Sequence, residues 1–298
     1  MSLLVIDIGG SSVKHAVWEK EELVEKGSFV TPKTWEEMKQ ELQNLKKKME
    51  ETYEIEGVAF SAPGAVNQEK RTIEGASAVP YVHHFPIYTE LEELLGCPIS
   101  MENDANCAGL AEVWRGAAKG LKNVLFVVIG SGIGGAVIVD GKIQHGKHLF
   151  GGEFGFMLLN ENHTFSQLGT AVHMARRYSK RMNLDTELSG KEVFELAEQG
   201  DHIAAEEVET FYYYLAQGIY NLQYSYDPEK IIIGGGVSSK EGLLSELTEH
   251  LEKIVEKVGI APFVPEVELC KYKNDANLIG AVYNYQLAHG KENLVNQD

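Results

Sequence analysis

Residues 3–14 read Leu3-Leu4-Val5-Ile6-Asp7-Ile8-Gly9-Gly10-Ser11-Ser12-Val13-Lys14, and the apolar character continues to Trp18. The pattern is typical of an apolar strand, a glycine-rich turn with hydroxyl side chains, and a second apolar strand. The same design returns over residues 124–139, in Val124-Leu125-Phe126-Val127-Val128-Ile129-Gly130-Ser131-Gly132-Ile133-Gly134-Gly135-Ala136-Val137-Ile138-Val139. Glycines without a Cβ let successive backbone N–H groups turn inward as an anion nest, to which the hydroxyls add donors. We therefore expect the chain to have two halves that together bind one polyphosphate.

The composition limits the class of protein. A chain of 298 residues with 44% hydrophobic content can bury a large core in about two domains. The net charge of -17, from 27 basic and 44 acidic residues, argues against partners such as nucleic acid or an anionic membrane. Bound phosphate must then be held locally, with a metal ion. The three cysteines are too scattered for a disulfide framework, and no signal segment or membrane span is recognisable, which predicts a cytoplasmic protein.

The order of elements repeats along the chain. In the first half, Thr34 is expected to cap a helix, and a strand over 57–62 ends in a loop at 63–67. A short strand over 97–102 is followed by a helix from Asp104 with a stripe of small residues that permits close packing. The second half is expected to hold helices at 167–181, 191–198 and 202–226, a strand at 230–233 and a helix from 239–242 onward. A last helix at 276–288 is expected to pack on the first half, before a polar tail over 290–298.

Two carboxylates have positions suited to phosphoryl transfer, which needs anion cradles, a divalent metal, a positioned acceptor and a base. Asp7 ends a strand that is otherwise apolar, where it could orient Mg²⁺ through water; the alternative is an Asp that caps an ordinary turn. Asp104 lies between a strand and a helix, where it could accept the proton of a substrate hydroxyl as that oxygen attacks the γ-phosphoryl group. The alternative for Asp104 is a helix-capping carboxylate and nothing more.

Six motifs occur in one order, namely Asp7-Ile8-Gly9-Gly10-Ser11, Ala62-Pro63-Gly64, Glu102-Asn103-Asp104-Ala105-Asn106, Ile129-Gly130-Ser131-Gly132-Ile133-Gly134-Gly135, Gly151-Gly152-Glu153-Phe154-Gly155 and Ile233-Gly234-Gly235-Gly236-Val237. Over essentially the whole chain, this series resembles the ROK family of sugar kinases and repressors. The resemblance implies an α/β, two-domain, actin-like ATPase fold (ribonuclease H-like) with ATP and Mg²⁺ in a cleft between the domains. It implies a small sugar-binding and catalytic domain over 1–117, with a C-terminal helix at about 274–290, and a large ATP-binding domain over 118–273.

The resemblance also assigns roles to residues. Asp104 matches the catalytic base, and Gly64, Asn103, Asp104 and Glu153 match the residues that bind the sugar. The residues expected at the nucleotide are Asp7, Gly9, Gly10, Ser11, Lys14, Gly130, Ser131, Gly132, Gly134, Gly234, Gly235 and Gly236. Ser11 stands where threonine is commoner in the family, but it keeps the hydroxyl.

The chain departs from the family pattern at Phe156. Many members have a His three residues after the sugar-binding carboxylate, and that His serves both the sugar and a zinc site completed by nearby cysteines. Here the position is Phe156 and no cysteine follows in 160–170, which predicts that there is no structural zinc. In the family the His reaches the anomeric end of the sugar, so that Phe156 removes a donor and adds an apolar face. With Phe156 at this position, the chain resembles the β-glucoside kinase branch of the family.

The predicted activity is ATP-dependent phosphorylation of a sugar, most specifically of the 6-hydroxyl of a glucose unit in a β-glucoside such as cellobiose. Glucose itself and N-acetylmannosamine are the alternative acceptors. A sugar-responsive repressor is disfavoured because the chain is acidic and starts directly with the catalytic strand, and a sugar sensor is disfavoured because Asp104 and both glycine turns are present. The resemblance implies a homodimer.

Overall fold

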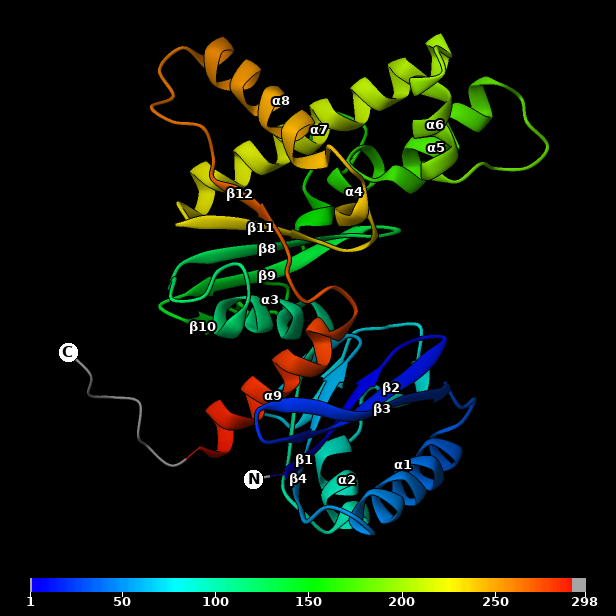
Figure 1. The fold of residues 1–298 in the computed structure, drawn as a ribbon, viewed down its shortest axis with the longest axis vertical. Helices are drawn as coiled ribbons and strands as arrows, with labels where there is room; N and C mark the ends of the chain where they lie inside the picture. The colour runs from blue at the N-terminus through cyan, green and yellow to red at the C-terminus, as the bar shows by residue number, and fades with distance from the viewer. Residues whose placement is uncertain (1, 291–298) are drawn as a thin grey trace. The chain divides into compact units, whose positions relative to one another are not determined.

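The computed structural model describes residues 2–290, and the chain divides into two compact units (Figure 1). Residues 2–116, 146–150 and 274–290 belong to the first unit, and residues 117–145 and 151–273 form the second. Beyond Gly290, the expected polar tail lies outside the described residues. Each unit has its own five-stranded sheet and its own hydrophobic core, as independent domains do.

The first unit is built on a mixed sheet with the strand order β3-β2-β1-β4-β7. The strands are β1 Ser2–Ile8, β2 Ser12–Glu19, β3 Glu22–Val30, β4 Ile55–Ala62 and β7 Ile99–Asn103. The neighbours β1/β2 and β2/β3 run antiparallel, whereas β1, β4 and β7 run parallel to one another. Since the carboxyl ends of parallel strands meet at one edge of a sheet, the residues that follow β1, β4 and β7 are gathered there.

Helices cover both faces of this sheet, which explains why every residue of β1 is buried. They are α1 Trp35–Glu50, α2 Ile87–Leu95, α3 Asp104–Arg115 and α9 Ala276–His289. Successive side chains of a strand point to opposite faces. Accordingly, Leu4 and Ile6 pack in a cluster with residues of α1 and α2, whereas Leu3 and Val5 pack in another with residues of α3 and α9.

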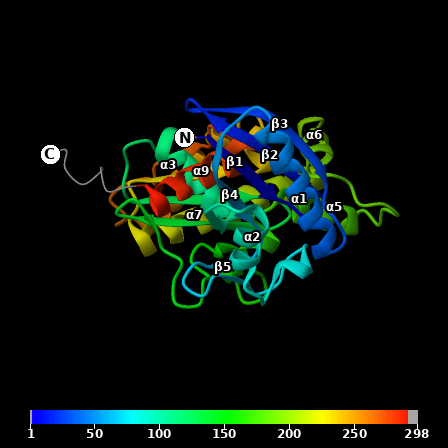
Figure 2. The ribbon, with the colours of Figure 1, turned by 90° about the horizontal axis from the view of Figure 1, so that it is seen from below.

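The last helix completes the first unit, as predicted. Figures 1 and 2 show α9 beside α3. A Cβ at Gly280 of α9 would overlap the carbonyl oxygen of Cys107 on α3, so the two backbones touch at this point. This close approach depends on Gly280, which lies on α9 and not in the stripe of small residues predicted along α3.

Two local predictions for this unit have different outcomes. Thr34 caps α1 in a capping box: Thr34 Oγ1 accepts a hydrogen bond from the N–H of Glu37, and the Glu37 carboxylate accepts one from the N–H of Thr34. The loop predicted over 63–67 is wrong in part, because β5 Ala65–Asn67 pairs with β6 Thr72–Glu74 in a small separate hairpin. A single turn of 3₁₀ helix, η1 Pro80–Val82, follows.

The second unit has the same sheet topology, in the order β10-β9-β8-β11-β12. Its strands are β8 Val124–Ile129, β9 Ile133–Val139, β10 Lys142–Ile143, β11 Lys230–Gly234 and β12 Val267–Leu269. As in the first unit, a hairpin (β8/β9) is followed by parallel pairings, here β8/β11 and β11/β12. The repeat inferred from the two glycine-rich stretches is therefore present in the fold.

Figure 1 shows the helices of this unit gathered over one face of the sheet. They are α4 Phe165–Leu168, α5 Ala171–Arg181, α6 Gly190–Glu198, α7 His202–Tyr226 and α8 Leu243–Val258, with 3₁₀ turns η2 Phe154–Phe156, η3 Gly236–Ser239 and η4 Lys273–Asp275. Leu125, Val127 and Ile129 of β8 share a core with α7 residues. The single helix predicted over 167–181 is two helices, since the Thr170 side chain caps α5 after α4 has ended.

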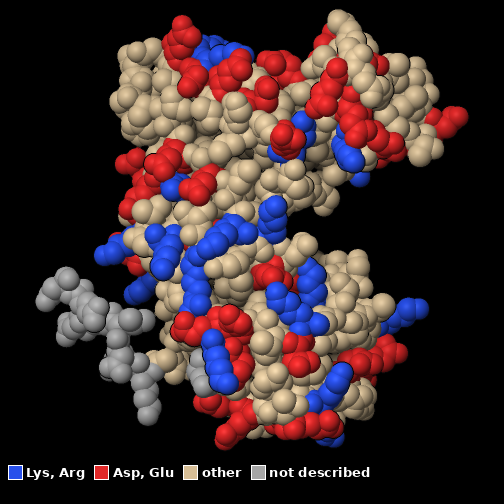
Figure 3. Space-filling model, viewed as in Figure 1, with Lys and Arg blue, Asp and Glu red and all other residues tan. Residues whose placement is uncertain are grey.

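The predicted two-domain α/β fold is confirmed. Acidic side chains are distributed over the visible face of both units (Figure 3), in keeping with the net charge of -17. Among residues 2–290, each helix is too short or too polar to cross a lipid bilayer.

Candidate active site

In the first unit, the parallel strand ends bring three predicted site residues together. Asp7 lies opposite Ser61 in the β1/β4 pairing, and Ser61 lies opposite Glu102 in the β4/β7 pairing. Asp7, Ser61 and Glu102 therefore form a row across three neighbouring strands. Asn103 and Asp104 follow Glu102 directly in the sequence. The sheet register thus places Asp7, Asn103 and Asp104 at one edge.

Asp7 is 7% exposed and is held through one oxygen. Its Oδ1 accepts hydrogen bonds from Ser61 Oγ at 2.8 Å and from Asn277 Nδ2 at 3.1 Å. The carboxylate therefore points to side chains of β4 and α9, and its bonds are not those of a turn cap. Lys14 faces Asp7 across the β1/β2 pairing and makes no ion pair with a described residue.

The surroundings of Asp7 fit Mg²⁺ bound mainly by water and phosphate. Magnesium keeps several waters and takes one or two carboxylates together with substrate phosphates. Within residues 2–290, no cluster of three or more His, Cys, Asp or Glu side chains could hold a metal ion by itself. Asp7 Oδ2 is the oxygen left for a water-mediated contact, and the absence of a structural zinc stays a prediction.

The first N–H of each predicted anion nest is used inside its own turn. The N–H of Gly9 donates to the carbonyl of Ser12 at 3.1 Å, and the N–H of Gly130 donates to that of Gly132 at 2.9 Å. Among the other donors of these turns, the backbone N–H and hydroxyl of Ser11 and of Ser131 make no hydrogen bond to a described residue. The two turns thus offer fewer donors than the sequence suggests, and each still offers a serine.

Asn103, rather than Asp104, caps helix α3. Its Oδ1 accepts from the N–H groups of Ala105 and Asn106, and its Nδ2 donates to the carbonyl of Gly64 at 3.0 Å. The Asn103 amide joins the end of β7 to the loop after β4, and its second N–H remains for a ligand. Gly64 and Asn103, both predicted at the sugar, therefore lie side by side.

Burial raises the pKa of Asp104, and the negative charge of Asp7 raises it further. The N–H of Ala105 donates to Asp104 Oδ1 at 2.8 Å and opposes the shift only in part. A carboxylate with a raised pKa is a better proton acceptor at neutral pH than an ordinary aspartate. The geometry and the electrostatics both suit a general base.

The sequence alone indicates no role for Glu102, which directly precedes Asn103 in β7. Its carboxylate is buried and accepts from the Asn103 N–H at 2.8 Å, Asn106 Nδ2 at 2.9 Å and Gln68 Nε2 at 2.8 Å. These bonds fix the backbone that leads into Asp104. Glu102 belongs to the quoted Glu-Asn-Asp motif, but its partner Gln68 gives no signal in the sequence.

In the second unit, Glu153 shares a pocket with the glycine turn. A cavity of about 420 Å³ is lined by Gly132, Gly134, Glu153, Phe156 and residues of α4. The chain approaches β9 closely here: Gly152 has φ +94°, and a Cβ on it would overlap the backbone of Gly135. This glycine contact sets Glu153 and Phe156 beside the turn, and Phe156 is 68% exposed.

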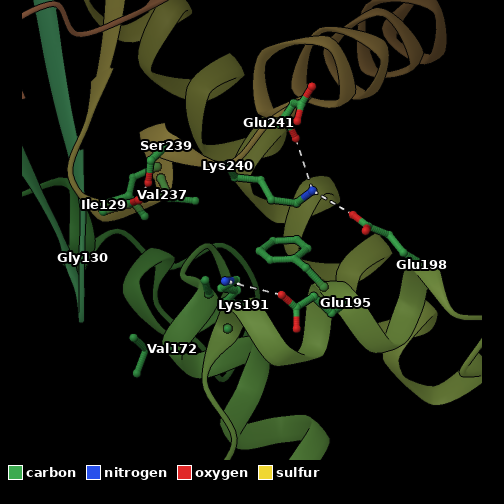
Figure 4. A pocket seen from close by; sticks show the side chains of 14 residues that line it. Ile129, Gly130, Val172, Lys191, Glu195, Glu198, Val237, Ser239, Lys240 and Glu241 are labelled. Atoms are coloured by element: carbon green, nitrogen blue, oxygen red, sulfur yellow. Dashed lines mark hydrogen bonds and ion pairs between the residues drawn. The ribbon is translucent and has the colours of Figure 1, made fainter.

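A second pocket, of about 570 Å³, begins at Ile129 and Gly130 and extends between α5, α6 and the segment after β11 (Figure 4). Its walls include the apolar side chains of Val172, Phe194 and Val237.

Ion pairs lie along the wall of this pocket. Lys240 Nζ lies 3.2 Å from Glu198 Oε1 and 5.0 Å from the centre of the Phe194 ring, and Lys191 pairs with Glu195 at 3.6 Å. Gly236 also lines the pocket, directly after Gly234 and Gly235. An apolar slot that starts at a glycine turn is suited to a flat heterocycle attached to phosphates.

Two α/β domains of one sheet topology, each with a glycine-rich hairpin, together with carboxylates at the strand ends of the first, are the architecture of the actin-like class of two-domain phosphotransferases. The model of the ROK family matches residues 3–288. The chain belongs to the ROK family and is a sugar kinase.

Relatives cover nearly the whole chain. The β-glucoside kinase of Listeria monocytogenes is 32% identical over 297 residues, which are 96% of this chain and 97% of the relative. A ROK family protein from Streptococcus pneumoniae, solved in complex with sucrose, is 35% identical with a TM-score of 0.88, over 97% of this chain and 99% of that one. The ROK glucokinase of Streptomyces griseus, solved with glucose and AMPPNP, has the same fold at 24% identity and a TM-score of 0.74, over 94% and 98% of the two chains.

Proposed function

We propose that this sugar kinase transfers the γ-phosphoryl group of ATP to the 6-hydroxyl of the non-reducing glucose unit of a β-glucoside such as cellobiose. The observation that carries the choice of acceptor is Phe156, which lines the Glu153 pocket with an exposed ring. An aromatic face stacks on a sugar ring or an aglycone, whereas the histidine that is common at this position would donate to the anomeric hydroxyl.

Two relatives support this acceptor. The Listeria monocytogenes enzyme is named a β-glucoside kinase, and the Streptococcus pneumoniae protein was solved with a disaccharide, sucrose. Both match this chain over nearly its full length. Glucose itself and N-acetylmannosamine are the alternative acceptors, and a pocket that requires a free anomeric hydroxyl would favour them.

In the proposed reaction, Asp104 is the general base. Its carboxylate takes the proton of the 6-hydroxyl as that oxygen forms a bond to the γ-phosphorus, and the bond from the γ-phosphorus to the bridging oxygen of ADP breaks. Asn103 donates its remaining amide N–H to a sugar hydroxyl, Gly64 offers a backbone contact, and Glu153 accepts from sugar hydroxyls. The raised pKa of Asp104 supports the role of proton acceptor.

The nucleotide is proposed to be ATP, with its base in the pocket of about 570 Å³ and its phosphates at the two glycine turns. Gly9, Gly10, Ser11 and Lys14 serve one turn, and Gly130, Ser131, Gly132 and Gly134 serve the other, while Gly234, Gly235 and Gly236 border the adenosine. Asp7 would hold Mg²⁺ through water, and the ion would neutralise charge on the phosphate oxygens. In this proposal the first unit is the sugar-binding and catalytic domain, the second is the ATP-binding domain, and the enzyme is a homodimer.

The test is ADP release by the purified protein with Mg-ATP and a panel of acceptors: cellobiose, gentiobiose, glucose, N-acetylmannosamine, N-acetylglucosamine and fructose. The expected result is the highest kcat/KM for a β-glucoside, lost in an Asp104→Asn control. Turnover of glucose or an N-acetylated sugar without turnover of cellobiose would overturn the acceptor. Binding of a sugar with no turnover of any would favour a sensor.

A further inference from the structure

We propose that Ser61 and Asn277 are positioning residues that hold Asp7 by one oxygen so that its other oxygen faces the magnesium–nucleotide. The inference rests on the proposed function of Asp7. It adds two residues, from different parts of the sequence, to the machinery of the reaction.

Both donors meet the same oxygen. Ser61 Oγ lies 2.8 Å and Asn277 Nδ2 lies 3.1 Å from Asp7 Oδ1. Asp7 Oδ2 accepts no hydrogen bond from a described residue, although Asp7 is only 7% exposed. Nor does Oδ2 belong to the fully buried polar atoms that lack a partner, so solvent reaches it. A solvent-accessible oxygen can exchange its water for a hydrated ion or a ligand, whereas Oδ1 is already occupied by two donors.

The two donors are fixed by rigid elements. Ser61 is fully buried in β4 and lies directly opposite Asp7 in the strand register. Asn277 is in the first turn of α9, 270 residues from Asp7 along the chain. Because one donor comes from the sheet and the other from a helix packed on it, together they fix both the rotamer and the carboxylate plane of Asp7. The free oxygen is thereby aimed before the nucleotide binds.

The alternative is that the two bonds only tie α9 to the sheet. The two roles differ in what they change, because a structural tie affects stability, whereas a positioning role affects how strongly Mg²⁺ tightens nucleotide binding. The quantity to measure is therefore the ratio of ADP affinities with and without Mg²⁺, obtained by isothermal titration calorimetry on the full chain. This ratio needs no turnover.

The variants are Ser61→Ala and Asn277→Ala, each with a matched control. Ser100→Ala removes a buried hydroxyl from β7 that has no partner among the described residues, and Asn284→Ala removes a buried amide from α9, two turns after Asn277. We expect each test variant to lower the ratio about tenfold, which corresponds to about 1.4 kcal/mol. ADP affinity without Mg²⁺ and the KM for the sugar should stay unchanged, and both controls should keep the wild-type ratio.

The Asp7→Asn variant distinguishes a failure of the proposed role of Asp7 from a failure of the positioning inference. If Asp7→Asn leaves the ratio unchanged, the proposed role of Asp7 itself is wrong. If Asp7→Asn lowers the ratio but Ser61→Ala and Asn277→Ala lower only the melting temperature, the positioning inference is overturned and the bonds are structural. Asn277→Ser, which keeps a shorter donor, should recover part of the ratio and provides a second variant at that position.

Discussion

The amide oxygen of Asn103 caps helix α3, and the carboxylate of Asp104, the next residue, shares only the Ala105 N–H with that cap. An aspartate at the start of a helix is usually explained by capping, which satisfies the first N–H groups. Here Asn103 accepts from the N–H groups of both Ala105 and Asn106, so the helix does not need the additional bond from the Ala105 N–H to Asp104 for that purpose. Asp104 retains a half-buried negative charge near Asp7, an arrangement that costs stability and suits catalysis.

Asp104→Asn should therefore abolish activity and stabilise the protein. Loss of the general base should lower kcat by a factor of about 10² to 10⁴. A carboxyl whose pKa is raised by folding binds a proton more readily in the folded than in the unfolded state, so its ionised form destabilises the fold at neutral pH. This destabilisation fades as the pH falls through the raised pKa. Thermal denaturation should show a higher melting temperature for the variant at pH 7 and a smaller difference in acid; a lower melting temperature at pH 7 would contradict this account.

The pH dependence of kcat/KM should report the same carboxyl. The acid limb should lie above pH 3.8, the ordinary value for Asp, because burial raises the pKa of Asp104 and the ionised form is the active one. Asp7→Asn removes a neighbouring negative charge and should move the limb to lower pH, whatever its effect on the maximal rate. The control is Asp140→Asn, at an exposed turn of the second unit, which should leave the limb in place. A limb that does not move in Asp7→Asn would show that another group controls it.

Phe156→His should shift the preference from β-glucosides to free glucose. The histidine would restore a donor toward the anomeric hydroxyl and remove an aromatic face whose stacking is worth roughly 0.5–1.5 kcal/mol. The ratio of kcat/KM for cellobiose to that for glucose should fall about tenfold. Leu158→His is the matched control, since Leu158 is equally exposed, at 68%, two residues further along. An equal fall in both variants would mean that the change acts on the loop and not on the acceptor.

The sequence predicts the parts of this site that are encoded locally. The strand, turn and strand around Asp7 and Gly130 follow from apolar runs interrupted by glycines, and Asp104 follows from its position between a strand and a helix. These signals lie within a few residues of the side chains concerned, and the structure contains the expected elements. Even here, the use of the Gly9 and Gly130 N–H groups inside their own turns depends on atomic detail that a glycine pattern does not contain.

The rest of the site depends on contacts between distant segments. Asn277 reaches Asp7 across 270 residues, and Gln68 reaches Glu102 across 34, with no periodic pattern to indicate either pair. The pocket at Gly130 likewise takes Phe194 from α6 and Lys240 from the segment after η3. Their positions follow from how the helices pack on the sheet, which a single sequence does not specify.

Val172→Trp should weaken nucleotide binding selectively. Val172 is half-buried at the start of α5, and Figure 4 shows its side chain at the wall of the pocket of about 570 Å³. An indole there would occupy space that the base of ATP is proposed to fill, and because it enters a cavity instead of a packed core, the fold should tolerate it. The KM for ATP should rise at least about tenfold, a loss of about 1.4 kcal/mol of binding, while the KM for the sugar stays the same. Lys180→Trp places the same side chain on an exposed position of α5 and should change neither constant. An unchanged KM for ATP in Val172→Trp would mean that the base binds elsewhere.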